Sequence, residues 1–272
     1  MNIKKLALIK TIAIGIFILS LILIGICLNN SLIESNFDVK NLSPSFSHLF
    51  GTDSLGRDIF FRTIKGLATS LTIGLLASIF SAIIALIIGV LSGLLPKGID
   101  DCFGFLIDLV LSIPHLILLI LISFSLGRGL YGVAVGLILS HWTGLARIIR
   151  AEVLSLKEEQ YVKISKKLGK SNFYIIMHHL LPHLLPQFII GTVILFPHAI
   201  LHEASITFLG FGLPPESPAI GVMLAESMAY LQTGKLWYLL PGVCFVIIVL
   251  LFDILGKNFK ILLQKDVYLE EK

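Results

Sequence analysis

Residues 160–171 read QYVKISKKLGKS, a polar and basic stretch that lies between two apolar runs of membrane-spanning length. Three side chains in it recur at helical spacing and predict a short amphipathic helix: Tyr161, Ile164 and Leu168. Gly169 is expected to end this helix, and Ser171 or Asn172 to cap a second one that runs to Leu181. The pattern predicts two short helices and a tight turn outside the membrane. They form either a docking element for a partner or a solvated loop whose lysines set the topology.

The composition places the rest of the chain in a membrane. Of its 272 residues, 56% are hydrophobic and 14% are charged, against roughly 45–50% and about 25% in soluble domains. The apolar runs are continuous, which excludes the alternating pattern of a membrane β-barrel. A helix needs roughly 20 apolar residues to cross the bilayer, and the runs that meet this need are Leu6–Leu28, Leu67–Leu94, Phe103–Leu126, Leu130–Ala146, Leu184–Phe208 and Leu239–Leu255. We therefore expect an all-α polytopic membrane protein with six transmembrane helices.

The distribution of lysine and arginine predicts the orientation. These residues are more frequent in the segments that share a side with residues 160–171 than in the segments on the other side. Because basic residues concentrate on the cytoplasmic side, we expect the insert and both termini to be cytoplasmic. The net charge of +4 is spread over separate segments, so it indicates topology and no nucleic-acid partner.

Ionisable residues within the spans are candidates for a functional role, because they are costly in lipid unless they face protein or water. Asp108 lies early in the third span, and Pro114-His115 interrupts that span. Asp108 and His115 are therefore candidate contacts along a transport pathway. For Asp108, an interhelical hydrogen bond or a contact with water is the alternative interpretation.

His198, His202 and Glu203 form a local cluster in the fifth span. Histidines four residues apart share one helical face and are able to bind one metal ion, and Glu203 would add an oxygen ligand. All three are candidates both for the pathway and for a metal site. Pro197 disturbs the helix at this point, however, and histidines that line a pathway also serve as simple hydrogen-bonding groups.

Three segments resemble the permease subunits of ABC importers. In that family the coupling motif reads Glu-Ala-Ala, three residues, Gly, nine residues, Ile, one residue, Leu-Pro, and Gly169, Leu181 and Pro182 are in register with it. The match is incomplete, because Lys163-Ile164-Ser165 replaces Glu-Ala-Ala and His179 replaces Ile. The stretches at 51–58 (GTDSLGRD) and 203–212 (EASITFLGFG) resemble the dipeptide, oligopeptide and nickel branch of the family.

The resemblance implies a type I importer fold and a role as a permease subunit that forms half of a pathway for di- or oligopeptides or for nickel, free or chelated. The residues that would couple the chain to an ATPase are Tyr161, Ile164, Ser165, Leu168, Gly169, Leu181 and Pro182. Expected partners are a homologous second permease subunit in a heterodimer, two cytoplasmic ATPase subunits, an extracytoplasmic substrate-binding protein and the lipid bilayer of a prokaryotic cell membrane.

The same resemblance assigns ATP and magnesium to the partner subunits, and this chain has no phosphate-binding loop motif and no expected cofactor of its own. We expect one membrane domain over residues 1–272. Its parts are an anchor helix at 1–30, an extracytoplasmic segment at 31–66, a permease core at 67–257 and a cytoplasmic tail at 258–272.

Two other classes of function compete with the permease. An intramembrane metalloprotease would need His-Glu-x-x-His, but Ile206 stands where the second histidine belongs after His202-Glu203. A secondary transporter would usually show internal repeats and more helices. Copurification with a nucleotide-hydrolysing partner would distinguish an importer from both.

Overall fold

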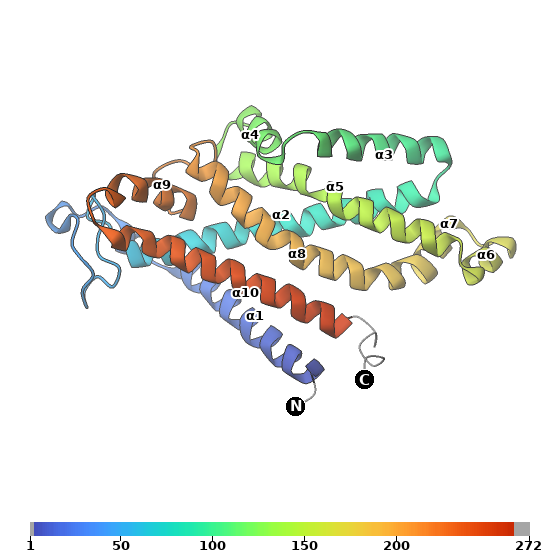
Figure 1. The fold of residues 1–272 in the computed structure, drawn as a ribbon, viewed down its shortest axis with the longest axis horizontal. Coiled ribbons are helices and arrows are strands. Elements are labelled where there is room, and N and C mark those ends of the chain that lie inside the picture. Colours follow the sequence, from blue (N-terminus) through green and yellow to red (C-terminus); the bar gives the residue numbers. More distant parts are fainter. Residues whose placement is uncertain (1–2, 264–272) are drawn as a thin grey trace.

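Apolar helices make up the bundle in the computed structural model of the chain, which describes residues 3–263 (Figure 1). Five helices are long and apolar enough to cross a membrane. They are α1 (Ile3–Cys27), α2 (Ile59–Leu94), α5 (Gly129–Lys157), α8 (Leu181–Phe208) with the turns before it, and α10 (Leu240–Leu263). The bent pair α3 (Lys97–Ser112) and α4 (His115–Ser125) forms a sixth span when it is counted as one. On that count the prediction of an all-α protein with six spans is confirmed.

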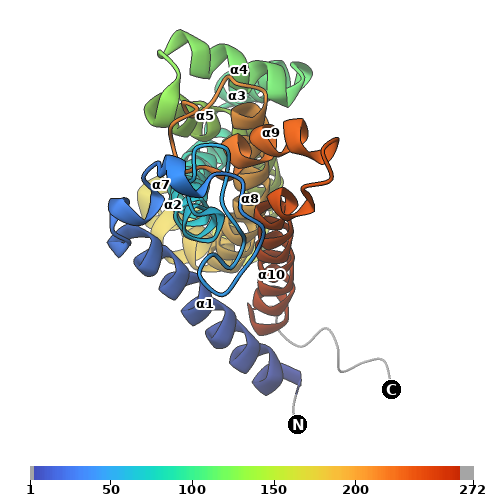
Figure 2. The same ribbon diagram turned by 90° about the vertical axis from the view of Figure 1, so that its left-hand side faces the viewer.

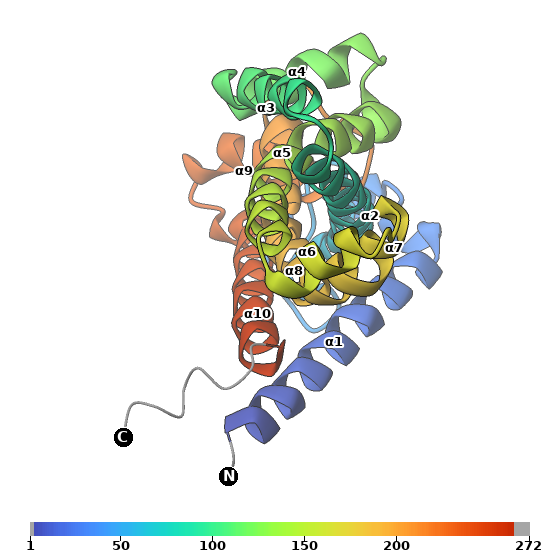
Figure 3. The same cartoon turned by 90° about the vertical axis from the view of Figure 1, so that its right-hand side faces the viewer.

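The helices α2, α5 and α8 form the centre of the bundle (Figures 1 and 2). The pair α3 and α4 lies along one side of α5, while α1 and α10 pack against each other on the opposite side of the bundle (Figure 3). Small side chains allow the central helices to approach closely. A Cβ atom added to Gly74 of α2 would lie only 2.2 Å from the Cγ2 atom of Ile200 on α8. The absence of a side chain at Gly74 therefore lets α2 pack closely against α8.

The third span is two helices and not one. Pro114 has no backbone N–H to donate and disfavours helical geometry in the residue before it. Ile113 accordingly has extended backbone angles, and α3 and α4 meet at an angle of 95°. The interruption expected at Pro114-His115 is thus confirmed: the span over Phe103–Leu126 is broken, with His115 as the first residue after the break.

The two ends of the bundle carry different structures (Figure 1). At one end, called the insert end below, lie α6 (Gln160–Lys167), α7 (Asn172–Ile175) and a π-helical turn (Ile176–Leu180). At the other, called the loop end, lie the segment 28–58, with its short 3-10 helices Asn30–Ile33 and Phe37–Val39, and α9 (Ile220–Leu231), which a 3-10 turn (Leu236–Leu239) joins to α10. The start of α1 and the end of α10 point away from the loop end (Figure 1).

Several helices extend beyond the apolar runs that predicted them. α2 begins at Ile59 and not at Leu67, so part of the expected segment 31–66 is helical. The second helix of the insert, expected over Phe173–Leu181, continues into α8 without interruption. α10 runs to Leu263, past the expected core boundary at residue 257, and residues 264–272 of the expected tail lie outside the described residues.

Candidate functional site

The turn between α6 and α7 is fixed by backbone hydrogen bonds. Gly169 has a φ of 76°, in the left-handed region that glycine adopts without strain. The N–H groups of Gly169 and Lys170 each donate to a carbonyl of the last turn of α6, at 3.1 Å from Lys166 O and 3.1 Å from Ser165 O. This pair of bonds is the Schellman arrangement that ends many helices. Ser171 then caps α7 by accepting a bond from the N–H of Tyr174 at 3.2 Å, so both the predicted stop and the predicted cap are confirmed.

Buried side chains fix the insert to the bundle. Val162 of α6 and Ile175 of α7 are almost completely buried, and they belong to the same apolar cluster as Leu156 of α5 and Leu184 of α8. Ser165 is paired with His179 of the π-helical turn at 2.8 Å between Oγ and Nε2, which ties the two arms of the insert together. Because apolar packing and a polar bond both hold it, the insert is a rigid extension of α5 and α8.

The opposite face of the insert is apolar and exposed. Tyr161, Ile164 and Leu168 are 42%, 54% and 73% exposed. Phe173 of α7 is 72% exposed, and with these three residues it defines what we call the docking face. Such a concentration of exposed apolar side chains at the tip of the insert is typical of an interaction surface.

The remaining residues expected in the coupling motif lie at the start of α8. Leu181 is half-buried and Pro182 is exposed, and both belong to the first turn of that helix. Glu158, which precedes α6, is paired with Lys163 at 2.8 Å. The hydrogen bond from the Lys163 ammonium lowers the pKa of that exposed carboxyl.

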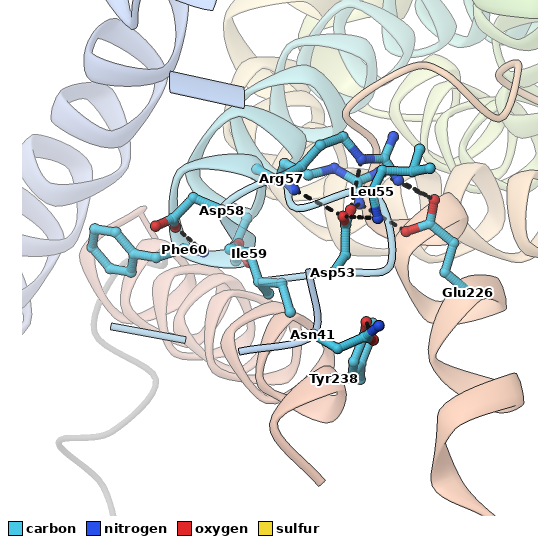
Figure 4. A network of polar contacts seen from close by, with 11 residues as sticks. Asn41, Asp53, Leu55, Arg57, Asp58, Ile59, Phe60, Glu226 and Tyr238 are labelled. Atoms are coloured by element: carbon cyan, nitrogen blue, oxygen red, sulfur yellow. Dashed lines mark hydrogen bonds and ion pairs between the residues drawn. The ribbon is translucent and has the colours of Figure 1, made fainter. Parts of the chain in front are cut away.

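A largely buried network of two arginines and two carboxylates lies at the loop end (Figure 4). Arg62 of α2 is only 2% exposed, and its Nη1 donates to Asp53 at 2.6 Å and to Glu226 of α9 at 2.8 Å. Arg57 bonds the same two carboxylates at 2.6 and 2.9 Å. Two arginines and two carboxylates thus balance in charge, as buried ions must. The network joins the segment that resembles the peptide and nickel branch to both α2 and α9.

Asp108 lies on α3 and forms an ion pair with Arg147 of α5, in which both side chains are exposed. This pair links the broken span to a central helix. The interhelical hydrogen bond considered from the sequence is therefore present, while a role of Asp108 in a transport pathway stays a prediction.

The sequence-predicted histidines and Glu203 lie in three different environments. The rings of His115 and His202 stack at 4.4 Å between centroids, whereas His198 is exposed one turn earlier on α8. Glu203 is completely buried, and its Oε1 accepts a bond from Thr207 at 3.0 Å. The structure therefore brings together His115 and His202, and it places Glu203 within the bundle.

The sequence analysis missed His141 of α5, whose Nε2 lies 3.0 Å from Nδ1 of His202. A signal for it was present, because His141 is an ionisable residue inside an apolar run, like Asp108. Glu226 was missed as well. Its partners are 164 and 169 positions away in the sequence, so no local pattern indicates them.

Comparison with known proteins identifies the family. The model of the family described as binding-protein-dependent transport system inner membrane component matches residues 85–261. The dipeptide transport system permease protein DppC of Alkalihalophilus pseudofirmus is 33% identical over 257 residues, which cover 94% of this chain and 84% of that protein. The protein of the same name from Bacillus subtilis is 33% identical and covers 85% of this chain and 72% of its own length.

The fold agrees with this match. An inward-facing structure of the MetNI methionine ABC transporter superimposes with a TM-score of 0.63 at 20% identity, covering 76% of this chain and 98% of that one. At such identity the likeness concerns the fold alone. The family match extends over the insert, α8 and most of α10, and one third of the residues are identical to those of a permease over nearly the whole chain. The chain therefore belongs to the binding-protein-dependent inner membrane components, the permease subunits of ABC importers.

Proposed function

We propose that this chain is one of two homologous membrane subunits of an importer that carries di- or oligopeptides into the cell, and that its insert docks onto a cytoplasmic ATPase subunit. The peptide cargo is supported by the relatives that are named dipeptide permeases. The competing secondary transporter and metalloprotease classes have no comparable support.

The observation that carries the docking proposal is the contrast between the two faces of the insert. One face is anchored by Val162 and Ile175, and the other presents the docking face, with Leu168 and Phe173 each more than two thirds exposed. A rigid element with an exposed apolar face suits a partner that has to push on it. A solvated loop would need neither the buried anchors nor the exposed apolar surface.

In this proposal the energy comes from the partner subunits. Two ATPase subunits bind ATP and magnesium and move together, and the docking face receives that movement. α5 and α8 begin or end at the insert, so they carry the displacement into the membrane. The pathway opens between this chain and its homologous partner after an extracytoplasmic binding protein delivers the substrate. The insert end and both termini are then cytoplasmic, and the loop end faces the binding protein.

The pathway contacts proposed for Asp108, His115, His198 and His202 follow from their positions. All four lie on α3, α4 or α8 and are at least partly exposed in the isolated chain. Glu203 has no exposed surface, so it would contact a substrate only after the helices around it move.

Copurification of the ATPase subunits tests the docking proposal. Ile164→Asp places a charge at the middle of the docking face, and it should lower the amount of ATPase that copurifies by roughly tenfold or more, because buried apolar anchors dominate protein interfaces. The matched control is Phe46→Asp, which makes the same kind of change at a fully exposed aromatic residue of the loop end. Equal recovery of ATPase with wild type and both variants would refute docking through this face.

A further inference from the structure

Three histidines from three separate helices converge inside the bundle. His115 is the first residue of α4, His141 lies in the middle of α5, and His202 lies on α8. One ring nitrogen from each lies within 4.8 Å of the other two. The rings of His115 and His141 are 4.4 Å apart between centroids, as are those of His115 and His202.

The hydrogen bonds of His141 indicate which of its two ring nitrogens has a lone pair for a metal ion. Its Nδ1 lies 3.0 Å from the carbonyl of Leu137, which only accepts, so Nδ1 carries the proton and donates it. Nε2 of His141 therefore holds a lone pair, which accepts a hydrogen bond from Nδ1 of His202 at 3.0 Å and which a bound metal ion would take in place of that bond. A histidine whose far nitrogen donates to a backbone carbonyl, while its near nitrogen faces the site, has the arrangement found in protein metal sites.

His115 supplies an independent indication. Its Nδ1 is buried and has no hydrogen-bond partner among the described residues, although its ring also lies within hydrogen-bonding reach of the Ser140 backbone. Buried polar atoms without a partner are rare, and each calls for an explanation such as an absent ion or water. The residue that carries this unpartnered nitrogen is one of the three histidines whose ring nitrogens converge.

From this convergence we propose that His115, His141 and His202 form a binding site for one divalent first-row transition-metal ion. Bonds from zinc to imidazole nitrogen are about 2.0–2.1 Å long, so two ligands of one tetrahedral ion lie roughly 3.3 Å apart. The nitrogens now lie within 4.8 Å of one another, so some of them would have to approach by up to about 1.5 Å. A donor set of nitrogens alone suits nickel, cobalt, copper or zinc, and it does not suit magnesium or calcium, which prefer oxygen.

The location of the three histidines favours an exchangeable ion over one that is permanently enclosed. His141 is buried, but His115 and His202 are only partly so, and the exposed His198 lies next to the group on α8. Three protein ligands leave a fourth position for water, for His198 or for a donor atom of a chelating molecule. The group also lies at the break between α3 and α4, and broken helices in membranes are tolerated where they border protein or a water-filled cavity.

The site differs from the cluster that the sequence predicted, and the two have His202 in common. Glu203 is enclosed within the bundle with Thr207 and is not one of the three ligands. His141 lies on α5 and not on α8, so the residue spacing within α8 does not predict it as a ligand. If the bound ion is cargo, alone or in a chelate, that role rests on the proposed import function, whereas binding of the ion does not.

Binding is tested on the whole transporter, purified with its partner subunits and reconstituted in lipid nanodiscs. Titration with Co²⁺ should give one bound ion per copy of this chain and the visible absorption of four-coordinate cobalt. His115→Ala, His141→Ala and His202→Ala should each weaken Co²⁺ binding by at least tenfold, because even loss of a supporting residue weakens metal sites 10–100-fold. His178→Ala, at an exposed histidine of the insert end, is the matched control and should bind as the wild type does.

A second variant keeps the test decisive if an alanine variant does not assemble. His115→Cys retains a ligand at the same position and should bind Co²⁺ with the added near-ultraviolet absorption of a cobalt–thiolate bond. Histidines that only hydrogen-bond to each other would give no such signal. The proposal is overturned if the wild type binds no Co²⁺ saturably, or if all three alanine variants bind it with wild-type affinity.

Measurements of substrate uptake distinguish a failure of the metal-site proposal from a failure of the proposed import function. Proteoliposomes that contain the complete transporter are given radioactive nickel or a labelled dipeptide, each with the binding protein and ATP. Loss of nickel uptake in His141→Ala with dipeptide uptake retained supports a metal cargo. If the wild type binds cobalt but takes up no nickel, the cargo role is overturned and the metal site stands. If the wild type imports neither nickel nor dipeptide, the proposed function is refuted and the metal site is unaffected.

Discussion

Replacement of Gly169 by valine tests whether the turn of the insert has to keep its shape for coupling. Gly169 has a φ of 76°, and the two bonds that close the turn depend on that conformation. Valine is β-branched and adopts the left-handed region with great difficulty. The substitution therefore acts on the backbone at one point of the surface that we propose meets the ATPase.

The size of the effect follows from the surroundings of Gly169. A Cβ atom added there meets nothing within 4 Å, so the substitution introduces no clash. The cost is then the left-handed conformation itself, about 1–2 kcal/mol for an ordinary residue and more for a β-branched one. A difference of this size changes the ratio of two states by a factor of about 5–30. The turn should open in a substantial fraction of molecules while the spanning helices, which it does not touch, stay folded.

The assay is ATP hydrolysis by the reconstituted transporter, measured with and without substrate-loaded binding protein. We expect Gly169→Val to reach the membrane normally and to lose most of the stimulation. Gly104→Val is the matched control, since Gly104 also has open space around it but lies inside α3 without a positive φ. Gly169→Asn should keep much of the activity, because asparagine tolerates the left-handed region. Stimulation of Gly169→Val equal to that of Gly104→Val would refute the reasoning.

Three further outcomes are expected from the packing and the charges. Arg62→Met should lower the free energy of unfolding of the purified complex by up to the roughly 3–5 kcal/mol typical of a broken buried ion pair, and an unchanged melting temperature would contradict the network. Gly74→Ala should destabilise by about 1–3 kcal/mol through overpacking, whereas Gly144→Ala, with nothing within 4 Å, should be neutral or stabilising in the same melting experiment. In a background without the natural cysteines, a cysteine at the exposed Ser47 should react with an impermeant thiol reagent added outside intact cells and one at the exposed Lys166 should not; the reverse result would invert the topology.

The turn of the insert was predictable because its causes are local. Gly169 and Ser171 act on backbone groups within four positions of themselves, so the sequence alone identifies the end of one helix and the start of the next. The outward direction of Ile164 was not predictable in the same way. Which face of a short helix is buried depends on Val162 meeting α5 and α8, and that is a tertiary contact.

The start of α2 shows the limit of apolar patterning. The expected span began at Leu67 because Arg62 and Lys65 interrupt the apolar run. In the structure the helix begins at Ile59, because the side chain of Asp58 caps it by accepting bonds from the N–H groups of Phe60 and Phe61. Arg62 is tolerated inside this helix because it is paired with Asp53 and with Glu226, which lies on a distant part of the chain. A hydropathy scale treats Arg62 as a charge exposed to lipid, whereas in the folded chain this side chain is buried and paired. Hydropathy therefore places the start of the span too late.

The three histidines also could not be grouped from local sequence patterns, because they come from three different helices. Their position connects them to the insert. His141 and His202 lie on α5 and α8, the two helices that flank the insert, while His115 lies on α4 beyond the break in the third span. At a rise of about 1.5 Å per residue, His141 is about 24 Å from the end of α5 and His202 about 32 Å from the start of α8. The insert holds those two ends together through the buried Val162 and Ile175. In the proposed coupling, a push on the docking face moves α5 and α8 together, and His115 follows only as far as α4 stays packed against them. Any difference between these motions changes the distance from His115 to the other two rings, so the affinity of the site for a metal ion is the quantity that movement of the insert would alter.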